Sequence, residues 1–169
     1  IIFYLIFYYY LILFFIMAKV LEIAISKNSK GEMKNVNNVK TFAGKGLEGD
    51  RHFKANNNKR SQITLIESEN INYYNKISGT SIQLINFRRN IITQGINLNE
   101  FLNKEFLIGK VKVKAHDLCR PCKFLQERLK QTDIIKEFIM PMAGACGARE
   151  EGYAFNAAKR ALRDAIWAD

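Results

Sequence analysis

The sequence predicts a mainly β fold, a β-barrel with peripheral helices. Segments that alternate polar and apolar residues recur between positions 19 and 116, glycine and asparagine turns separate them, and helical patterns between them are few. With 48% hydrophobic residues the chain is not disordered, and 3 cysteines in 169 residues are too few for a disulfide scaffold.

Five segments are predicted strands. Lys110–His116 alternates most regularly, so Val111, Val113 and Ala115 should face the core while the lysines between them face solvent. The other four segments are Lys19–Ile25, Gln62–Ile66, Asn90–Thr93 and Phe106–Ile108.

Two helices are predicted between and after these strands. The first is Ser68–Ile77, which is followed closely by Gly79, a residue suited to a helix C-cap. The second is Pro121–Lys130, which begins with a proline, a residue favoured at the first position of a helix. Their expected buried stripes are Ile71, Tyr74 and Ile77 in the first helix and Phe124, Leu125 and Leu129 in the second.

The two ends of the chain differ in composition from the body. Residues 1–16 are uncharged and apolar, near the lower length limit for crossing a hydrocarbon core of about 30 Å. No basic segment precedes them, so we expect Met17 to start the domain and residues 1–16 to lie outside it. The alternatives are a membrane anchor and a signal peptide.

The last 29 residues, 141–169, are neutral overall and contain nine alanines, whereas residues 17–140 contain five alanines and the whole net charge of +10. We therefore expect a domain over 17–140 followed by an atypical tail, helical over Phe155–Trp167. A junction between differently biased coding sequences is the other explanation of this change.

The segment from His116 to Cys122 carries the most informative chemistry. Cys122 falls at the start of the predicted helix, and Arg120 and Lys123 flank it with positive charge. Both features stabilise a thiolate, so Cys122 is the predicted nucleophile, sulfur carrier or metal ligand. Cys119 is a weaker candidate because it precedes the helix.

Three other interpretations of this segment stay open. A structural zinc site could use His116, Cys119 and Cys122, with Cys146 as a fourth ligand. The Cys-Arg-Pro-Cys spacing also occurs in thioredoxin-like dithiols, although these belong near the start of a βαβ fold. The two cysteines could also be buried and inert.

Two further segments are candidate anion sites. The glycine-rich turn Gly44–His52 could bring Lys45, Arg51 and His52 to a phosphate or another oxyanion. In Phe87–Asn90 the paired guanidiniums are typical of an anion clamp. The alternatives are a structural turn and a solvated strand edge.

The positive charge also raises the question of nucleic-acid binding. The lysines at 110, 112 and 114 form a stripe that could follow a phosphate backbone. No nucleic-acid motif and no interleaved aromatic residues accompany the stripe, so we expect a solvated strand face and no nucleic-acid partner.

Five blocks in order resemble a small stand-alone, bacterial-type MOSC domain, the C-terminal domain of the molybdenum cofactor sulfurases. The blocks are Gly46–His52, Ser61–Glu67, Arg88–Thr93, Phe106–Gly109 and Leu118–Cys122. The resemblance extends over residues 19–138. It implies a pyruvate kinase β-barrel-domain-like barrel, and a cysteine, matched by Cys122, that carries sulfur or coordinates molybdenum.

The resemblance also implies which residues bind the anionic pterin cofactor. By motif position these are Lys45, Gly49, Asp50, Arg51, His52, Arg88, Arg89, Asn90 and Arg120. Pyridoxal phosphate is implied only through a separate sulfurase partner. Small MOSC domains continue into a basic glycine segment and a closing strand, whereas residues 139–149 lack that pattern, so neither terminus takes part in the resemblance.

The expected function is binding of molybdenum cofactor, sulfur transfer through Cys122, or both, in a cytoplasmic protein. Such a protein is an oxidoreductase or a component of a sulfur transferase, and its partners are the pterin cofactor or a sulfur donor protein. The alternatives are a non-catalytic binding or delivery domain and, if residues 1–16 are an anchor, a location at the membrane.

Overall fold

Two β-sheets form the framework of the protein in the computed structural model, which describes residues 18–118, 121–137, 143–148 and 154–156. The larger sheet has the order β2 (Lys34–Asn35), β1 (Lys19–Ile25), β6 (Ile91–Gln94), β5 (Ile63–Glu67), β9 (Ala143–Ala148), β8 (Val111–Leu118) and β7 (Glu105–Ile108). The smaller sheet has the order β10 (Ala154–Asn156), β3 (Asn38–Phe42) and β4 (Gly46–Leu47). The prediction of a β-rich fold is confirmed.

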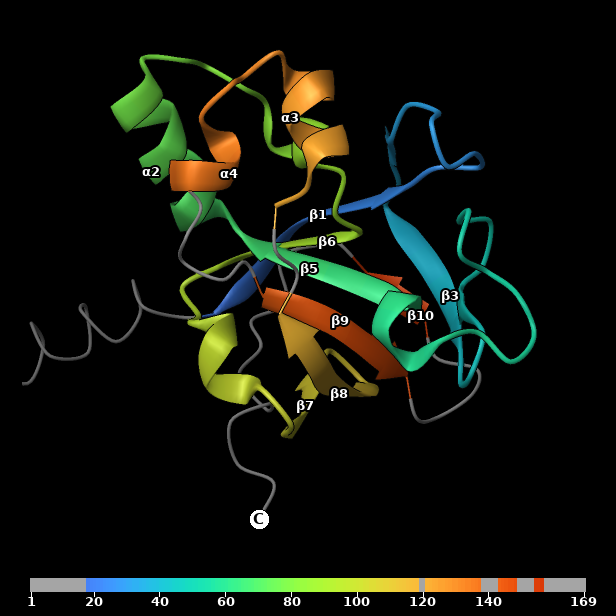
Figure 1. Cartoon of the computed structure of the whole chain (residues 1–169). Coiled ribbons are helices and arrows are strands. Elements are labelled where there is room, and N and C mark those ends of the chain that lie inside the picture. Colours follow the sequence, from blue (N-terminus) through green and yellow to red (C-terminus); the bar gives the residue numbers. More distant parts are fainter. Residues whose placement is uncertain (1–17, 119–120, 138–142, 149–153, 157–169) are drawn as a thin grey trace, which may run out of the picture.

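Helices lie together on one side of the larger sheet (Figure 1). They are α2 (Ser68–Ser78), α3 (Lys123–Leu129) and α4 (Ile134–Glu137). Single 3-10 turns η1 (Lys59–Ser61), η2 (Leu84–Phe87) and η3 (Leu98–Phe101) join other elements. Between the helices and the sheet, one apolar cluster contains Ile66, Ile71, Tyr74, Phe87, Ile92, Leu125 and Ile134. The fold is therefore mixed α/β with its helices segregated to one side.

Nearly all the described strand pairs are antiparallel, and the exception is β5 with β6. The chain crosses from β5 to β6 through α2 and η2, as a parallel pair requires. Strand β1 has the predicted bounds, and the other four predicted strands are displaced by one or two residues at their ends. In β8, Val111, Val113 and Ala115 are buried as predicted.

The helix predictions hold for position but not for every buried side chain. Helix α2 ends at Gly79, whose φ of 65° is left-handed, so the predicted cap is confirmed. Ile77 is 43% exposed because α2 is buried through Ile71 and Tyr74. Phe124 is 39% exposed, and Leu125 is the buried residue of α3. The predicted stripes are therefore wrong at Ile77 and Phe124.

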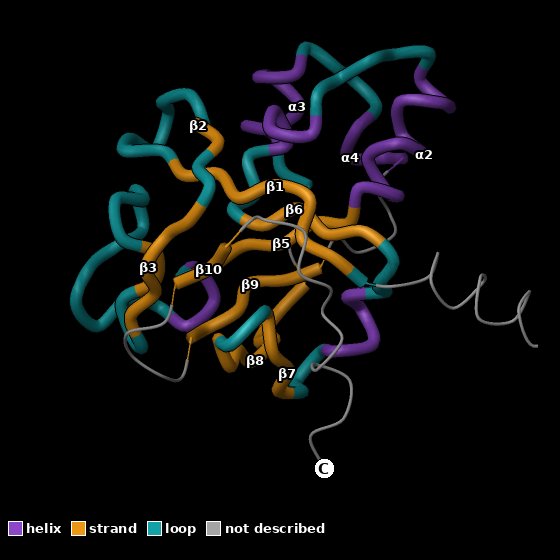
Figure 2. Tube along the Cα trace, turned by 180° about the vertical axis from the view of Figure 1, so that it is seen from behind, coloured by secondary structure: helices purple, strands orange, loops and turns teal. Residues whose placement is uncertain are grey.

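The chain beyond residue 140 contributes two strands, which differs from the predicted domain boundary. Strand β9 lies between β5 and β8, and Cys146 is in register with Ile63 on one side and Ala115 on the other. Strand β10 pairs with β3, and Figure 2 shows the two side by side. Phe155 therefore lies in a strand, and the rest of the predicted helix, residues 157–167, lies outside the described residues.

Residues 1–16 also lie outside the described residues, so the predictions for them stay predictions. In the part of the chain that the structure describes, no helix combines the length and the apolar composition that membrane crossing needs.

Candidate functional site

The glycine-rich segment folds into a turn that the Asp50 carboxylate fixes to the end of β1. Asp50 is 6% exposed. Its Oδ1 accepts a 3.0 Å hydrogen bond from the Ser26 N–H, and its Oδ2 accepts one of 3.0 Å from the His52 N–H. Gly49, with φ of 80°, supplies the left-handed backbone just before it. The turn thus holds the residues after Asp50 against the sheet.

Asn90, the residue just before β6, completes this attachment and is fully buried. Its Nδ2 donates to Oδ1 of Asp50 at 3.2 Å and to the Ala24 carbonyl at 3.1 Å. Its Oδ1 accepts from the N–H and the hydroxyl of Thr64, at 3.1 and 2.8 Å. One amide therefore connects β1, β5 and the turn, and the structure gives Asp50 and Asn90 a positioning role.

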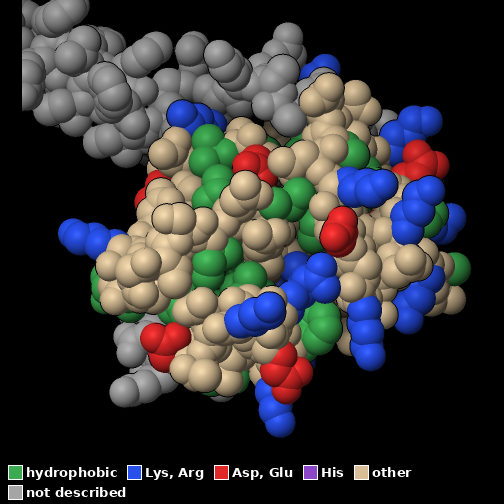
Figure 3. Space-filling model, turned by 90° about the horizontal axis from the view of Figure 1, so that it is seen from above, with side chains coloured by type: hydrophobic (Ala, Val, Ile, Leu, Met, Phe, Trp, Pro, Cys, Tyr) green, Lys and Arg blue, Asp and Glu red, His purple; other side chains and the backbone are tan. Residues whose placement is uncertain are grey.

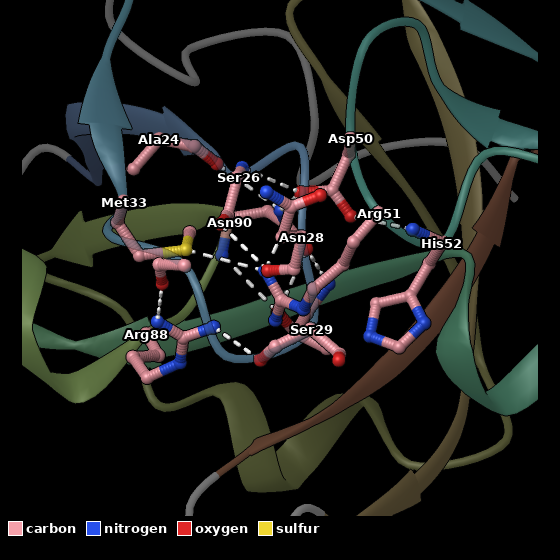
Figure 4. Close-up of polar contacts among 12 residues, drawn as sticks. Ala24, Ser26, Asn28, Ser29, Met33, Asp50, Arg51, His52, Arg88 and Asn90 are labelled. Carbon is pink, nitrogen blue, oxygen red and sulfur yellow. Dashed lines mark hydrogen bonds and ion pairs between the residues drawn. The ribbon is translucent and has the colours of Figure 1, made fainter. Parts of the chain in front are cut away.

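Four arginines gather beside this turn, and we refer to Arg51, Arg88, Arg89 and Arg128 as the arginine cluster. Arg51 lies 3.5 Å from Oδ1 of Asp50 and donates to Sδ of Met33 at 3.2 Å. Arg88, 4% exposed, follows η2 with a left-handed φ of 60°. It donates to the carbonyls of Gly31 and, at 2.8 Å, Ser29. Figure 4 shows Arg51 and Arg88 pointing toward the same loop.

The cluster holds more positive charge than its acidic neighbour balances. Burial, followed by the charges of Arg51 and Arg128, lowers the pKa of Arg88 to about 10. Burial also lowers the pKa of Arg51, and nearby Arg89 adds to this effect. Within the described residues, Asp50 is the acidic group that raises both pKa values. An anion at the cluster would offset this charge.

Arg89 gives a second, separate indication that the cluster binds an anion. Its Nε is buried and has no hydrogen-bond partner among the described residues. Buried donors are normally paired, so this atom suits an acceptor supplied from outside the protein.

Figure 3, which views the helix side, shows that Lys and Arg side chains are more common there than Asp and Glu.

His52 gives this region a pH dependence. Burial, and then the charge of Arg51, lowers its pKa below 6.5. The folded state therefore favours neutral His52, and its contribution to stability is present above about pH 6.5 and is lost as the pH falls through the lowered value. When the pH falls from about 7 to about 5, we expect the free energy of unfolding to decrease less in His52→Gln than in the wild type. Urea unfolding at each pH measures this difference. Equal losses would contradict this account.

Cys122 is exposed and is the residue immediately before α3. The predicted helix start at Pro121 is therefore two residues early, and Cys122 lies at the N-cap rather than in the first turn. Its carbonyl accepts from the Gln126 N–H at 3.1 Å. The ring centroid of Phe124 lies 5.7 Å from Cζ of Arg88, and Arg128 donates to the Lys30 carbonyl at 3.1 Å. Helix α3 thus connects the cysteine to the arginine cluster.

Some of the other predicted site residues lie within the described residues, and others lie outside them. The exposed Lys45 has its ammonium 5.9 Å from the ring centroid of Phe42. His116 is a half-buried residue of β8. Cys119 and Arg120 lie outside the described residues. No three His, Cys, Asp or Glu side chains within the described ranges are placed to hold a metal, and the zinc interpretation, which needs Cys119, stays a prediction.

The sequence profile of the MOSC domain matches residues 48–158, about two thirds of the chain. The chain belongs to the MOSC family. The match includes the residues from Asp50 to His52, the arginine pair and Cys122, and it extends through β9 and β10. The prediction that the C-terminal segment takes no part in the resemblance is therefore wrong for residues 141–158, which the family match includes.

Solved structures share the fold of this MOSC domain at low sequence identity. The YUAD protein from Bacillus subtilis has a TM-score of 0.70 at 17% identity, over 83% of this chain and 92% of that one. YiiM from Geobacillus stearothermophilus has a TM-score of 0.66 at 15% identity, over 83% and 71% of the two chains. YiiM from Escherichia coli has a TM-score of 0.63 at 16% identity, over 87% of this chain and 67% of that one. No curated protein sequence matches the chain significantly.

Two parts of the MOSC domain's site were missed from sequence. One is the loop Lys27–Met33, which receives the hydrogen bonds of Arg51, Arg88 and Arg128. The other is Arg128 itself. The polar run from Lys27 to Gly31 predicts a turn, but no local pattern indicates which side chains contact it.

Proposed function

We propose that this MOSC domain binds molybdenum cofactor, carries sulfur on Cys122, or does both, with the anionic part of its ligand at the arginine cluster. The observation that carries the proposal is the contact of Phe124 with Arg88, because it joins the helix that Cys122 begins to the buried guanidiniums.

The residues present suit a phosphate-bearing cofactor. Arg88 offers a buried guanidinium, and the buried Nε of the half-buried Arg89 lacks an acceptor within the described residues. Asp50 accepts hydrogen bonds from Ser26, His52 and Asn90, and its single negative charge offsets only part of the positive charge of the four arginines. When bound, molybdenum cofactor supplies a metal for redox chemistry or a centre that accepts sulfur.

In sulfur transfer, Cys122 acts as the nucleophile. Its thiolate attacks the terminal sulfur of a persulfide on a donor protein, and a new S–S bond forms at Cys122. The S–S bond of the donor breaks, and the donor cysteine leaves as a thiolate. The exposed position of Cys122 allows a protein-borne donor to approach it.

We also propose that the two sheets close into a barrel of the MOSC type. In β4, a Cβ added to Gly46 would lie 2.6 Å from the carbonyl oxygen of Gln62, just before β5, so the backbones approach closely there. Between β2 and β3, the Val36 N–H donates to the Ile23 carbonyl of β1 at 2.9 Å. The segment that carries β3 and β4 therefore contacts strands of the larger sheet at two places.

Anion binding gives a direct test of the cluster. We expect Arg89→Gln to weaken binding of inorganic phosphate or molybdate about tenfold, because a charged donor is lost from a partly buried site. Isothermal titration calorimetry measures the change. Arg60→Gln is the matched control, because Arg60 is exposed and pairs with Asp117 at 3.4 Å. Equal affinities of the two variants would contradict the proposed site.

A further inference from the structure

The loop Lys27–Met33, which we term the strap, is held by three members of the arginine cluster. Arg88 donates to the carbonyls of Ser29 and Gly31, and Arg128 donates to the carbonyl of Lys30. Arg51 donates to the thioether sulfur of Met33. Three successive carbonyls of one loop are thus bound by guanidiniums from two distant segments of the chain.

These acceptors are weak partners for the donors that hold them. The carbonyls and the thioether are neutral, whereas a guanidinium forms its strongest hydrogen bonds with charged oxygens. Arg88 is 4% exposed, and burial of a charge is unfavourable without a counter-ion. An oxyanion would therefore compete well with the strap carbonyls for the same donors.

The strap is joined to the sheet at its two ends. At one end Ser26 is fixed, since its N–H donates to Asp50 and its carbonyl accepts from the Arg51 N–H at 2.6 Å. At the other end Lys34 is in register with Ile25 in the β2–β1 pair. Residues 27–30 between these ends are exposed. Their release costs little buried apolar surface.

We propose that the strap carbonyls occupy the place of the ligand and can be displaced by it. An oxyanion of the phosphate or molybdate class accepts the hydrogen bonds of Arg88 and Arg128 in their place, and the strap is then released. The inference rests on the proposed function only in requiring that an oxyanion binds the cluster. In the protein without ligand, the strap occupies hydrogen-bond donors of the buried Arg88 and of the exposed Arg128 that an oxyanion would otherwise take.

Limited trypsin digestion tests the strap, because it contains two cleavage sites, Lys27 and Lys30. With saturating molybdate or phosphate, compared with chloride at equal ionic strength, we expect cleavage at these sites to accelerate about tenfold. Arg128→Gln should accelerate cleavage without any anion, since it frees the Lys30 carbonyl. We choose Arg128 because it is exposed, whereas replacement of the buried Arg88 threatens the fold. Arg60→Gln should leave cleavage unchanged.

The outcomes separate this inference from the proposed function. If calorimetry detects anion binding while strap cleavage stays constant or slows, the strap inference is wrong and the anion site stands. If no anion binds, both are contradicted. If Arg128→Gln and Arg60→Gln are cleaved at equal rates without anion, Arg128 does not hold the strap.

Discussion

Replacement of Cys122 by serine is expected to reduce persulfide formation about a hundredfold or more, to the background of the assay. A serine oxygen cannot form the S–S bond that carries the transferred sulfur. Stability should stay nearly constant, because Cys122 is exposed and its side chain accepts no capping hydrogen bond. The measurement is mass spectrometry of the protein after incubation with a persulfide donor, together with thermal unfolding of both proteins.

Cys119→Ser is the matched control for this prediction, because it removes the neighbouring thiol and leaves Cys122 in place. We expect it to retain most of the persulfide signal. A signal that survives in Cys122→Ser and disappears in Cys119→Ser would assign the chemistry to the other cysteine and contradict the proposed function.

Replacement of Asn90 by alanine is expected to lower the free energy of unfolding by about 3–5 kcal/mol. The change removes the four side-chain hydrogen bonds that connect Asn90 to Asp50, Ala24 and Thr64, all of which are buried. The groups left behind lose partners that water cannot replace. Urea unfolding measures this change.

Asn35→Ala is the control for that loss. The Nδ2 of Asn35 donates to the Glu22 carboxylate at 3.3 Å in an exposed position, so its removal should cost less than about 0.5 kcal/mol. Equal destabilisation by the two changes would show that the connection through Asn90 does not support the turn.

The local pattern of apolar and polar residues predicted those strands and helices whose buried side is decided by their own sequence. The alternation of β8 places Val111 and Val113 at 0% exposure, and the helix of residues 68–78 ends at the predicted Gly79. In both cases residues within one element decide which side is buried, so periodicity is sufficient. The order of the glycine turn, the arginine pair and the cysteine likewise indicated the family that the profile confirms.

Elements that depend on distant partners could not be predicted in this way. Strand β9 has the sequence Ala-Gly-Ala-Cys-Gly-Ala, which favours no strand by itself and pairs with β5 and β8 on either side. The strap contacts of Arg88 and Arg128 join residues 57 to 98 positions apart. Phe124 is exposed for the same reason, because its ring contacts Arg88 and not the core beneath α3.

Asp50 and Asn90 illustrate how motif position and physical role can differ. The motif placed both with the residues that bind the anionic cofactor. In the structure both are buried, and they hydrogen-bond to each other at 3.2 Å. Their carboxylate and amide hold the turn from which Arg51 extends. A sequence pattern identifies such residues because they are needed at the site, but it does not say whether they contact the ligand.

The central claim is that Cys122 and the arginine cluster form one site, and protection of Cys122 from alkylation tests it most directly. The rate of iodoacetamide modification at Cys122, followed by peptide mass spectrometry, is measured with and without molybdenum cofactor. We expect the cofactor to slow modification about tenfold in the wild type and much less in Arg89→Gln. If the cofactor binds through the cluster and leaves the rate at Cys122 unchanged, the cysteine and the arginines are separate sites and the claim is wrong.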